Sequence, residues 1–407
     1  MSYKVLDENS VVDYILSVDV TKEFFGDSKL MVKEIGDGNL NYVYIVSSND
    51  NESKALILKQ AVPYLRIVGE SYPLSRKRMT YEIRSLTHFS KLSEQYVPYI
   101  YHTDEDMSVI VMQYLGEHII MRNGMIDGII YPDFAEHIAS FLANTLFKTS
   151  SLYLSGTDKR ELIGEFNSNS ELCALTEMFV FTAPYMEHET NEINPLIMNE
   201  ASELQADVEF KTKILELKYK FMNQTDALLH GDLHTGSIMI NKDETYVIDS
   251  EFAFFGPFGF DVGALLGNLV MSWVSHFERS GDEKYQAWIL DSIKVFLMRF
   301  EDMFLELWTE QESSSLVEKG FLSSKEQTAF KDSFMLNILQ ESVGFAGAKI
   351  CRRQLGIAGV ADIRAIEDKE ARARAEKMAL KVGTSFVKKY KTIKNVNDVI
   401  NLIKRVV

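Results

Sequence analysis

The chain has 407 residues, too many for one small hydrophobic core and enough for two or three packed units. A hydrophobic fraction of 46%, with only 22 glycines and 7 prolines, excludes collagen-like and low-complexity chains. The 43 Lys and Arg residues against 59 Asp and Glu give a net charge of −16. Because no run of Lys and Arg offers a basic face, we expect neither nucleic acid nor an anionic membrane as a partner.

The cysteines and the apolar segments indicate the compartment. Cys173 and Cys351 are too few for a disulfide framework and fit a reducing environment. The first eight residues lack the apolar run of a signal peptide. The longest apolar stretch, residues 264–274, is too short to cross a bilayer. We therefore expect a cytoplasmic protein.

The first third of the chain has the pattern of a small sheet. Short runs rich in Val, Ile, Leu and Tyr, bounded by turn clusters, predict strands at 30–35, 42–46, 55–59 and 108–113. Between the last two, apolar residues at helical spacing predict one amphipathic helix over 76–92. We expect a mainly antiparallel sheet carrying one helix as an N-terminal domain, residues 1–115.

The remainder, residues 116–407, is predicted to be mainly helical, so the fold class is α+β. The predicted helices cover 134–149, 197–222, 282–304, 324–351 and 369–390. Short strands at 227–229, 237–240 and 246–248 interrupt the helical pattern, and each is followed by polar or glycine-rich chain.

The densest polar cluster of the sequence is His-Gly-Asp-Leu-His-Thr-Gly-Ser at 230–237, between two predicted strands. Asp249-Ser250-Glu251 follows the next strand, and a Gly/aromatic loop then ends at Asp261. Together with Asp232, these carboxylates would repel one another unless a cation lay between them. Hard oxygen ligands of this kind favour Mg²⁺ over Zn²⁺.

Three interpretations of this cluster are open. Loop carboxylates can simply be solvated or cap helices. His230, Asp232 and His234 could hold a transition metal in a metallohydrolase, although the other histidines show no paired ligand spacing. In phosphoryl transfer, one Asp orients the attacking hydroxyl while later carboxylates hold Mg²⁺ on the nucleotide phosphates.

Phosphoryl transfer also requires a glycine-rich turn and a lysine on a neighbouring strand. Gly-Asp-Gly-Asn-Leu-Asn-Tyr at 36–42 joins two predicted strands, Lys59 ends the third, and Glu82 on the following helix can pair with Lys59. The order of these features along the chain matches a bilobal, protein-kinase-like plan.

Several segments resemble the 5-methylthioribose kinases, small-molecule kinases of methionine salvage. The similar segments are 36–42, 59–70, 230–237, 249–251, 256–263 and the paired arginines that follow Cys351. The resemblance runs from about residue 8 to about residue 395. A His-Gly-Asp loop alone would not separate this family from aminoglycoside or choline kinases, whereas the combination with Asp-x-Glu and twin arginines does.

The resemblance implies the following roles for the catalytic and substrate residues. Asp232 acts as the base on the sugar 1-hydroxyl. Arg352 and Arg353 approach the substrate and neutralise the charge that develops during transfer, and His230 lies in the substrate site. Arginines in that position accelerate other phosphoryl transfers by about 10³–10⁵.

The resemblance also implies ATP and Mg²⁺ as cofactors, and a homodimer. The nucleotide-binding residues would be Gly38, Asn39 and Asn41 over the phosphates, Lys59 with its partner Glu82, and Gln113, Tyr114 and Leu115 at the adenine. Asp249 and Glu251 would ligate Mg²⁺.

The sequence departs from the expected pattern at two positions. Ser237 stands where protein kinases carry an Asn metal ligand, and Tyr72 stands where the family usually has Trp. The alternatives are another small-molecule kinase of the same fold, acting on an aminoglycoside, choline or homoserine, or a nucleotide-binding module without catalysis. Arg352 and Arg353 argue against a cationic substrate, and Asp232 with Lys59 argues against an inactive module.

Overall fold

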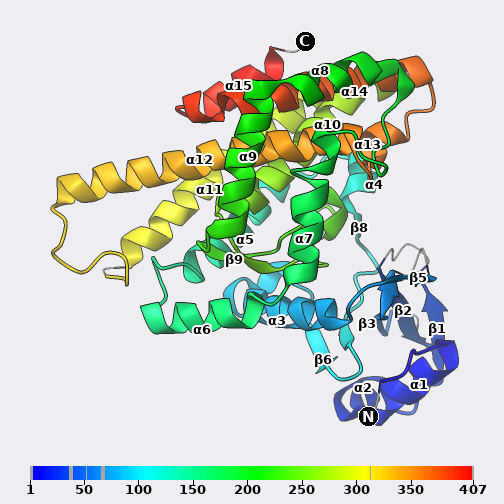
Figure 1. Ribbon diagram of the computed structural model, residues 1–407. Coiled ribbons are helices and arrows are strands. Elements are labelled where there is room, and N and C mark those ends of the chain that lie inside the picture. The colour runs from blue at the N-terminus through cyan, green and yellow to red at the C-terminus, as the bar shows by residue number, and fades with distance from the viewer. Residues whose placement is uncertain (1–2, 36–39, 52, 66–68, 312, 406–407) are drawn as a thin grey trace. The chain divides into compact units, whose positions relative to one another are not determined.

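The structure is a computed structural model that describes residues 3–35, 40–51, 53–65, 69–311 and 313–405. The predicted phosphate-binding residues Gly38 and Asn39 lie outside the described residues. Its contacts divide the chain into two compact units. The first comprises Met1–Ile119 with Tyr246–Ala253, and the second Ile120–Thr245 with Phe254–Val407. Each unit is described by itself below (Figure 1).

The first unit is built on a five-stranded antiparallel sheet in the order β1-β2-β3-β7-β6. Its elements up to residue 113 are α1 (Glu8–Ser17), α2 (Asp19–Phe25), β1 (Leu30–Glu34), β2 (Asn41–Ser48), β3 (Ala55–Ala61), β4 (Tyr64–Leu65), β5 (Gly69–Pro73), α3 (Lys77–Leu92), the 3₁₀ turn η1 (Glu94–Tyr96), β6 (Ile100–Asp104) and β7 (Val109–Gln113). The four predicted strands and the predicted helix correspond to β1, β2, β3, β7 and α3.

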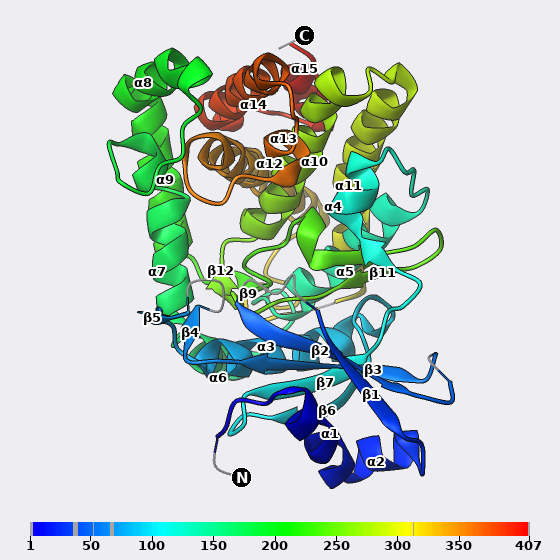
Figure 2. The ribbon, with the colours of Figure 1, turned by 90° about the vertical axis from the view of Figure 1, so that its right-hand side faces the viewer.

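Both faces of this sheet are covered, which explains why every residue of β3 except the partly exposed Ile57 is buried. Figure 2 shows α1 and α2 on one side of the sheet and α3 on the other. Leu56 and Leu58 point into the core formed with α1 and α2. Because side chains alternate along a strand, Lys59 points to the opposite face, where α3 packs.

The pair α1 and α2 was not among the predicted elements. The start of α1 is marked by a capping box in which the Asp7 side chain accepts from the Ser10 amide at 2.8 Å and the Ser10 hydroxyl accepts from the Asp7 amide at 2.8 Å.

The chain from residue 119 onward is mainly helical. Its elements are β8 (Ile119–Ile120), α4 (Met121–Ile126), α5 (Phe134–Lys148), α6 (Gly156–Phe166), α7 (Ser170–Phe179), η2 (Ala183–Tyr185), η3 (Pro195–Ile197), α8 (Met198–Ala206), α9 (Val208–Asn223), β9 (Ala227–Leu229), η4 (Thr235–Ser237), β10 (Ile238–Ile240), β11 (Thr245–Val247), β12 (Phe254–Gly256), α10 (Gly259–Arg279), α11 (Glu283–Glu310), α12 (Ser324–Leu355), α13 (Ala361–Arg364), α14 (Lys369–Lys389), η5 (Tyr390–Thr392) and α15 (Val396–Lys404). The helix predicted over 197–222 is two helices, because Asp207 caps α9 by accepting from the Phe210 amide at 2.9 Å. No helix among the described residues is long and apolar enough to cross a membrane.

The core of the second unit is the close contact of α10 with α12, which Figure 1 shows passing one another. Glycines recur every four residues on one face of α10, at 259, 263 and 267. A Cβ at Gly263 would lie 2.9 Å from Phe345 Cβ and 3.0 Å from the Ala346 amide nitrogen. The two helices therefore approach until their backbones nearly touch, and α12 is held in register with the beginning of α10.

We expect Gly263→Val to destabilise the protein, because the added side chain would push α12 away from α10. Overpacking of this kind costs about 1–3 kcal/mol, and a lowered melting temperature in a thermal unfolding scan would show it. Gly164→Ala in α6 is the matched control. A Cβ at Gly164 meets nothing within 4 Å, so this change should stabilise by about 0.5–1 kcal/mol. Equal melting temperatures for the two variants would contradict the close helix contact.

Candidate active site

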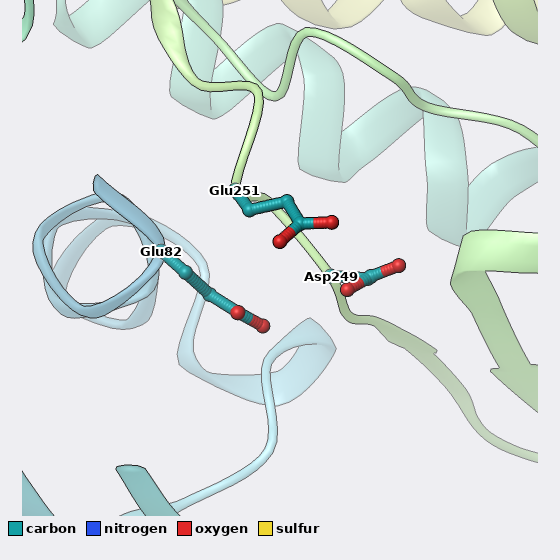
Figure 3. Close-up of side chains that lie close together, drawn as sticks. All are labelled: Glu82, Asp249 and Glu251. Carbon is teal, nitrogen blue, oxygen red and sulfur yellow. The ribbon is translucent and has the colours of Figure 1, made fainter. Parts of the chain in front are cut away.

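The first unit holds a cluster of charged side chains around Lys59. Figure 3 shows its three carboxylates, Glu82, Asp249 and Glu251. Lys59 lies in β3, and its ammonium donates to Glu82 Oε1 of α3 at 2.7 Å. It also donates to Asp249 Oδ1, which comes from the segment after β11. The ion pair predicted between Lys59 and Glu82 is present, and Asp249 joins it.

The segment 249–251 is pinned to α3. Ser85 donates to the Ser250 carbonyl at 3.2 Å, and the two serine hydroxyls lie 2.6 Å apart. Asp249 itself has a φ of 70°, in the left-handed region that a non-glycine residue adopts at a cost of about 1–2 kcal/mol. Backbone strain of this kind is typical of functional sites, where the surrounding contacts hold it in place.

Glu251 is held from the other side by Asn41 and Arg78. The Asn41 side-chain amide donates to Glu251 Oε2 at 3.0 Å, and Arg78 Nε donates to Asn41 Oδ1 at 3.0 Å. Arg78 Nε lies 3.6 Å from the Glu251 carboxylate. Asn41, predicted to cover the phosphates, is therefore placed beside one of the two predicted metal ligands.

The carboxylates of this cluster outnumber its positively charged side chains. Burial and the charge of Asp249 raise the pKa of Glu251 to about 8. Burial alone would lower the pKa of Lys59, but the carboxylates of Asp249, Glu82 and Glu251 outweigh burial and raise it. Glu82, Asp249 and Glu251 each offer an oxygen, and these oxygens lie within 4.8 Å of one another. Such a set of oxygen donors fits a divalent cation.

The three residues predicted to hold adenine follow one another at the end of β7. The Gln113 side-chain oxygen accepts from the Tyr99 amide at 3.2 Å. This hydrogen bond fixes the side-chain amide of Gln113 next to the residue that precedes β6. Leu115 is buried, and Tyr114 is half-buried.

In the second unit, residues 230–237 form a tightly hydrogen-bonded loop after β9. Asp261, in the first turn of α10, accepts from the His230 amide at 2.6 Å and from the Gly231 amide at 3.1 Å. Gly231 has a φ of 84°, which a glycine adopts without strain. Asp261 therefore stabilises the loop, whereas the sequence suggested that it joins the other carboxylates around a cation.

The side chain of Asp232 projects from this loop toward α12. Its Oδ1 lies 3.0 Å from Lys349 Nζ, and its Oδ2 lies 3.5 Å from His234 Nε2. Burial alone would raise the pKa of Asp232, but Lys349 and, further away, Arg353 and Arg352 hold it well below its usual value. Since 25% of the side chain remains exposed, an ionised carboxylate is available to a ligand.

The predicted Arg352 and Arg353 lie one turn beyond Lys349 on α12, and all three are buried. Arg353 donates to the Ala358 carbonyl at 2.6 Å. The Nε atoms of both arginines are buried and have no hydrogen-bond partner among the described residues. Three cations of α12 therefore accompany the carboxylate of Asp232, and the carboxylate of Asp362 also acts on Arg353. Lys349 was not among the residues predicted from the sequence, although its spacing of three and four residues from the arginines places all three on one helix face.

A fourth cation, Arg122 of α4, borders the same loop. Its Nε lies 3.3 Å from Asp362 Oδ2, and its Nη2 donates to Asn268 Oδ1 at 3.2 Å. A Cβ at Gly236 would lie 2.7 Å from Arg122 Nη1, so the end of the arginine side chain lies directly against the loop at this glycine. No sequence pattern singled out Arg122.

The two histidines of the loop, His230 and His234, accept hydrogen bonds from backbone amides of the same loop. His230 Nδ1 accepts from the Asp232 amide at 3.3 Å, and His234 Nδ1 accepts from the Gly236 amide at 3.1 Å. Among the described residues, the acidic triad of the first unit is the group whose side chains converge as metal ligands do. This geometry does not support the metallohydrolase interpretation.

We expect Asp261→Asn to loosen the loop that carries Asp232. An asparagine oxygen can accept from one amide, while its NH₂ group would face the other donor. A buried donor left without an acceptor costs about 1–3 kcal/mol, so both the melting temperature and kcat should fall. Asp243→Asn, in an exposed turn, should change stability by no more than about 0.5 kcal/mol. Wild-type stability and turnover in Asp261→Asn would contradict the role of Asp261.

Comparisons with known proteins agree on the class. A family model described as the phosphotransferase enzyme family matches residues 32–296, more than half of the chain. The solved structure of a glucosamine kinase in complex with glucosamine, ADP and inorganic phosphate aligns over 92% of this chain and 86% of its own, with a TM-score of 0.50 and 12% identity. The chain is thus a phosphotransferase with the α+β, bilobal kinase-like fold predicted from the sequence, and it uses ATP as a substrate.

Curated relatives identify the family within this class. Methylthioribose kinase 1 of Oryza sativa subsp. japonica is 41% identical over 98% of this chain and 94% of its own length. Methylthioribose kinase of Bacillus cereus (strain AH820) is 40% identical over 95% of this chain and 94% of its own. The chain belongs to the methylthioribose kinase family, which confirms the resemblance noted in the sequence.

Proposed function

We propose that this kinase transfers the γ-phosphate of ATP to the 1-hydroxyl of 5-methylthioribose, giving 5-methylthioribose 1-phosphate and ADP in methionine salvage. The observation that carries the substrate assignment is the identity of about 40% to curated methylthioribose kinases over almost the whole chain. The chemistry around Asp232 supports the reaction type, because an ionised carboxylate beside an excess of cations suits a base next to a phosphoryl group.

In the proposed step, Asp232 accepts the proton of the sugar 1-hydroxyl. The hydroxyl oxygen forms a bond to the γ-phosphorus, and the bond from phosphorus to the bridging oxygen breaks, so that ADP leaves. Arg352 and Arg353 neutralise the charge that spreads over the transferring phosphoryl oxygens. His230 contributes to the substrate site through the loop that its ring and amide hold in shape. Much of the acceleration comes from the positioning of these groups.

For the nucleotide, we propose that Lys59 contacts the α- and β-phosphates and that Glu82 holds the lysine in place. Asn41 lines the phosphates together with Gly38 and Asn39, and residues 113–115 bind adenine. Asp249 and Glu251 would hold Mg²⁺, which when bound neutralises phosphate charge. The surplus of carboxylate over cation in this cluster supports that assignment.

A kinase for a cationic substrate is the main alternative, and the charges near Asp232 disfavour it. Choline or an aminoglycoside would have to approach Lys349, Arg352 and Arg353, which are buried and outnumber the single carboxylate. Like charges at such short range are costly in a poorly solvated site. The homodimer implied by the resemblance stays a prediction.

The test is an ADP-release assay across 5-methylthioribose, ribose, choline, homoserine and kanamycin. We expect kcat/KM to be highest for 5-methylthioribose. Ribose should be weaker because it lacks the apolar methylthio group, and one or two buried groups of that size change kcat/KM by about 10–200-fold each. A preference for choline, homoserine or kanamycin would contradict the proposed substrate, and nucleotide binding without transfer to any acceptor would support the inactive module.

In the same assay, Asp232→Asn provides the catalytic control. It keeps the shape of the side chain but removes the base, so kcat should fall by about 10²–10⁴. Affinity for a fluorescent nucleotide should stay at the wild-type value. Retention of more than a few per cent of the turnover would remove Asp232 from the role of base.

We expect Asp249→Asn to weaken the Mg²⁺ dependence of nucleotide binding. Loss of one charged ligand should raise the Mg²⁺ concentration needed for half-maximal nucleotide affinity by about tenfold or more, on the scale at which ligand charge tunes such sites. Titrating Mg²⁺ against a fluorescent ATP analogue measures this without turnover. Glu105→Gln, which breaks an exposed ion pair with Arg84, is the control and should leave the titration unchanged. An unchanged titration in Asp249→Asn would exclude Asp249 as a ligand.

A further inference from the structure

Lys349 is a buried lysine whose ammonium is directed at the proposed base. It lies on α12 with 4% of its side chain exposed, and its Nζ is 3.0 Å from Asp232 Oδ1. The same nitrogen lies 4.8 Å from the centre of the Phe260 ring, in a cation–π contact. Within the described part of the chain, Asp232 is the one hydrogen-bond acceptor that this ammonium is recorded to reach.

A lysine in this position is expensive for the fold. Moving an ammonium out of water costs several kcal/mol, and the interactions with the Asp232 carboxylate and the Phe260 ring offset only part of this cost. Two arginines on the next turn, Arg352 and Arg353, add repulsion. An apolar side chain of similar length would fill the same space without these costs, so packing does not explain why a lysine is present.

The two oxygens of Asp232 differ in their surroundings. Lys349 donates to Oδ1, whereas Oδ2 accepts no recorded hydrogen bond from the described residues and lies 3.5 Å from His234 Nε2. His234 Nδ1 accepts from the Gly236 amide, so its proton is on Nε2. A quarter of the Asp232 side chain is exposed, so a ligand can reach the carboxylate, and Oδ2 is the oxygen that Lys349 does not contact.

We propose that Lys349 is a positioning residue of the phosphoryl transfer: it fixes Asp232 Oδ1, keeps the carboxylate ionised, and so presents Oδ2 to the attacking hydroxyl. This inference rests on the proposed function and deepens it. Lys349 acts through Asp232, whereas Arg352 and Arg353 neutralise the charge on the phosphoryl group.

The charged and titratable groups around the pair come from the loop, α10 and α12. Asp232 faces Lys349, His234, Arg353 and Arg352, while Lys349 also influences Asp261. Burial lowers the pKa of His234 to about 3, so this histidine is neutral at working pH. Burial, aided by the two arginines, lowers the pKa of Lys349 to about 8. Lys349 is therefore fully protonated only well below pH 8, and its charge is lost as the pH rises through about 8.

The test compares Lys349→Met and Lys349→Arg with the full-length wild type. We expect Lys349→Met to lower kcat by about 10–100-fold, the range expected when a catalytic group is misplaced by about 1 Å. The KM for ATP should stay within twofold and the melting temperature should not fall. Lys349→Arg keeps the charge and should recover at least a third of the lost turnover. The control is Lys220→Met. It removes a different lysine–carboxylate ion pair, between Lys220 and Glu341 of α12 at 2.5 Å, and should leave kcat unchanged.

The pH profile separates positioning from a structural role. Wild-type kcat should fall as the pH rises through about 8, and in Lys349→Arg this fall should move up by at least one pH unit, because a guanidinium stays protonated. The inference would be overturned if Lys349→Met kept turnover within threefold of wild type or raised the KM for ATP. It would also be overturned if both variants had a lowered melting temperature, or if the fall in kcat at alkaline pH did not move in Lys349→Arg. A wild type that phosphorylates no sugar would instead refute the proposed function.

Discussion

Asp232 keeps its negative charge in a mostly buried loop because cations of α12 lie beside it. A carboxylate removed from water takes up a proton unless a nearby positive charge compensates. The helix supplies that charge from one face, at Lys349 and one turn later at Arg352 and Arg353. The glycine face of α10 holds α12 close, and the first turn of α10 also carries Asp261, which fixes the loop. One helix pair therefore determines both the position of the carboxylate and the position of its partners.

The first unit has the opposite charge imbalance. There Lys59 and Arg78 face Glu82, Asp249 and Glu251, and burial together with the charge of Asp249 raises the pKa of Glu82 and of Glu251. An excess of buried negative charge is stable when a further cation binds, and oxygen donors at these separations suit a divalent ion. The excess of positive charge around Asp232 is likewise compensated when an anionic group binds.

The sequence predicted the parts of the fold in which local pattern and tertiary contact agree. The strands that became β1, β2, β3 and β7 were visible because both propensity and burial favour them. The ion pair of Lys59 with Glu82 followed from the order of the motifs. No helix was predicted over α10, and its first residues were expected to belong to a loop ending at Asp261. Glycine has a low helix propensity, and here the glycines allow the close packing of α10 against α12. Arg122 and Lys349 were not predicted, because a single cation forms no local sequence pattern. Their roles become visible only when the structure brings them next to the loop at 230–237.

Asp232 and Asp261 illustrate why residue type alone could not assign the site. Both are aspartates that contact the same loop, and both are largely removed from water. Asp261 is surrounded by backbone amides, accepts from two of them, and has its pKa raised by burial. Asp232 faces ammonium and guanidinium groups, which lower its pKa below the usual value. The environment pushes the two pKa values in opposite directions, and this divergence separates the ionised carboxylate that we propose as the base from the carboxylate that holds the loop. Because Lys349 donates to Asp232, and Arg352 and Arg353 also act on it, whereas Asp261 accepts from backbone amides, α12 determines which of the two aspartates stays ionised.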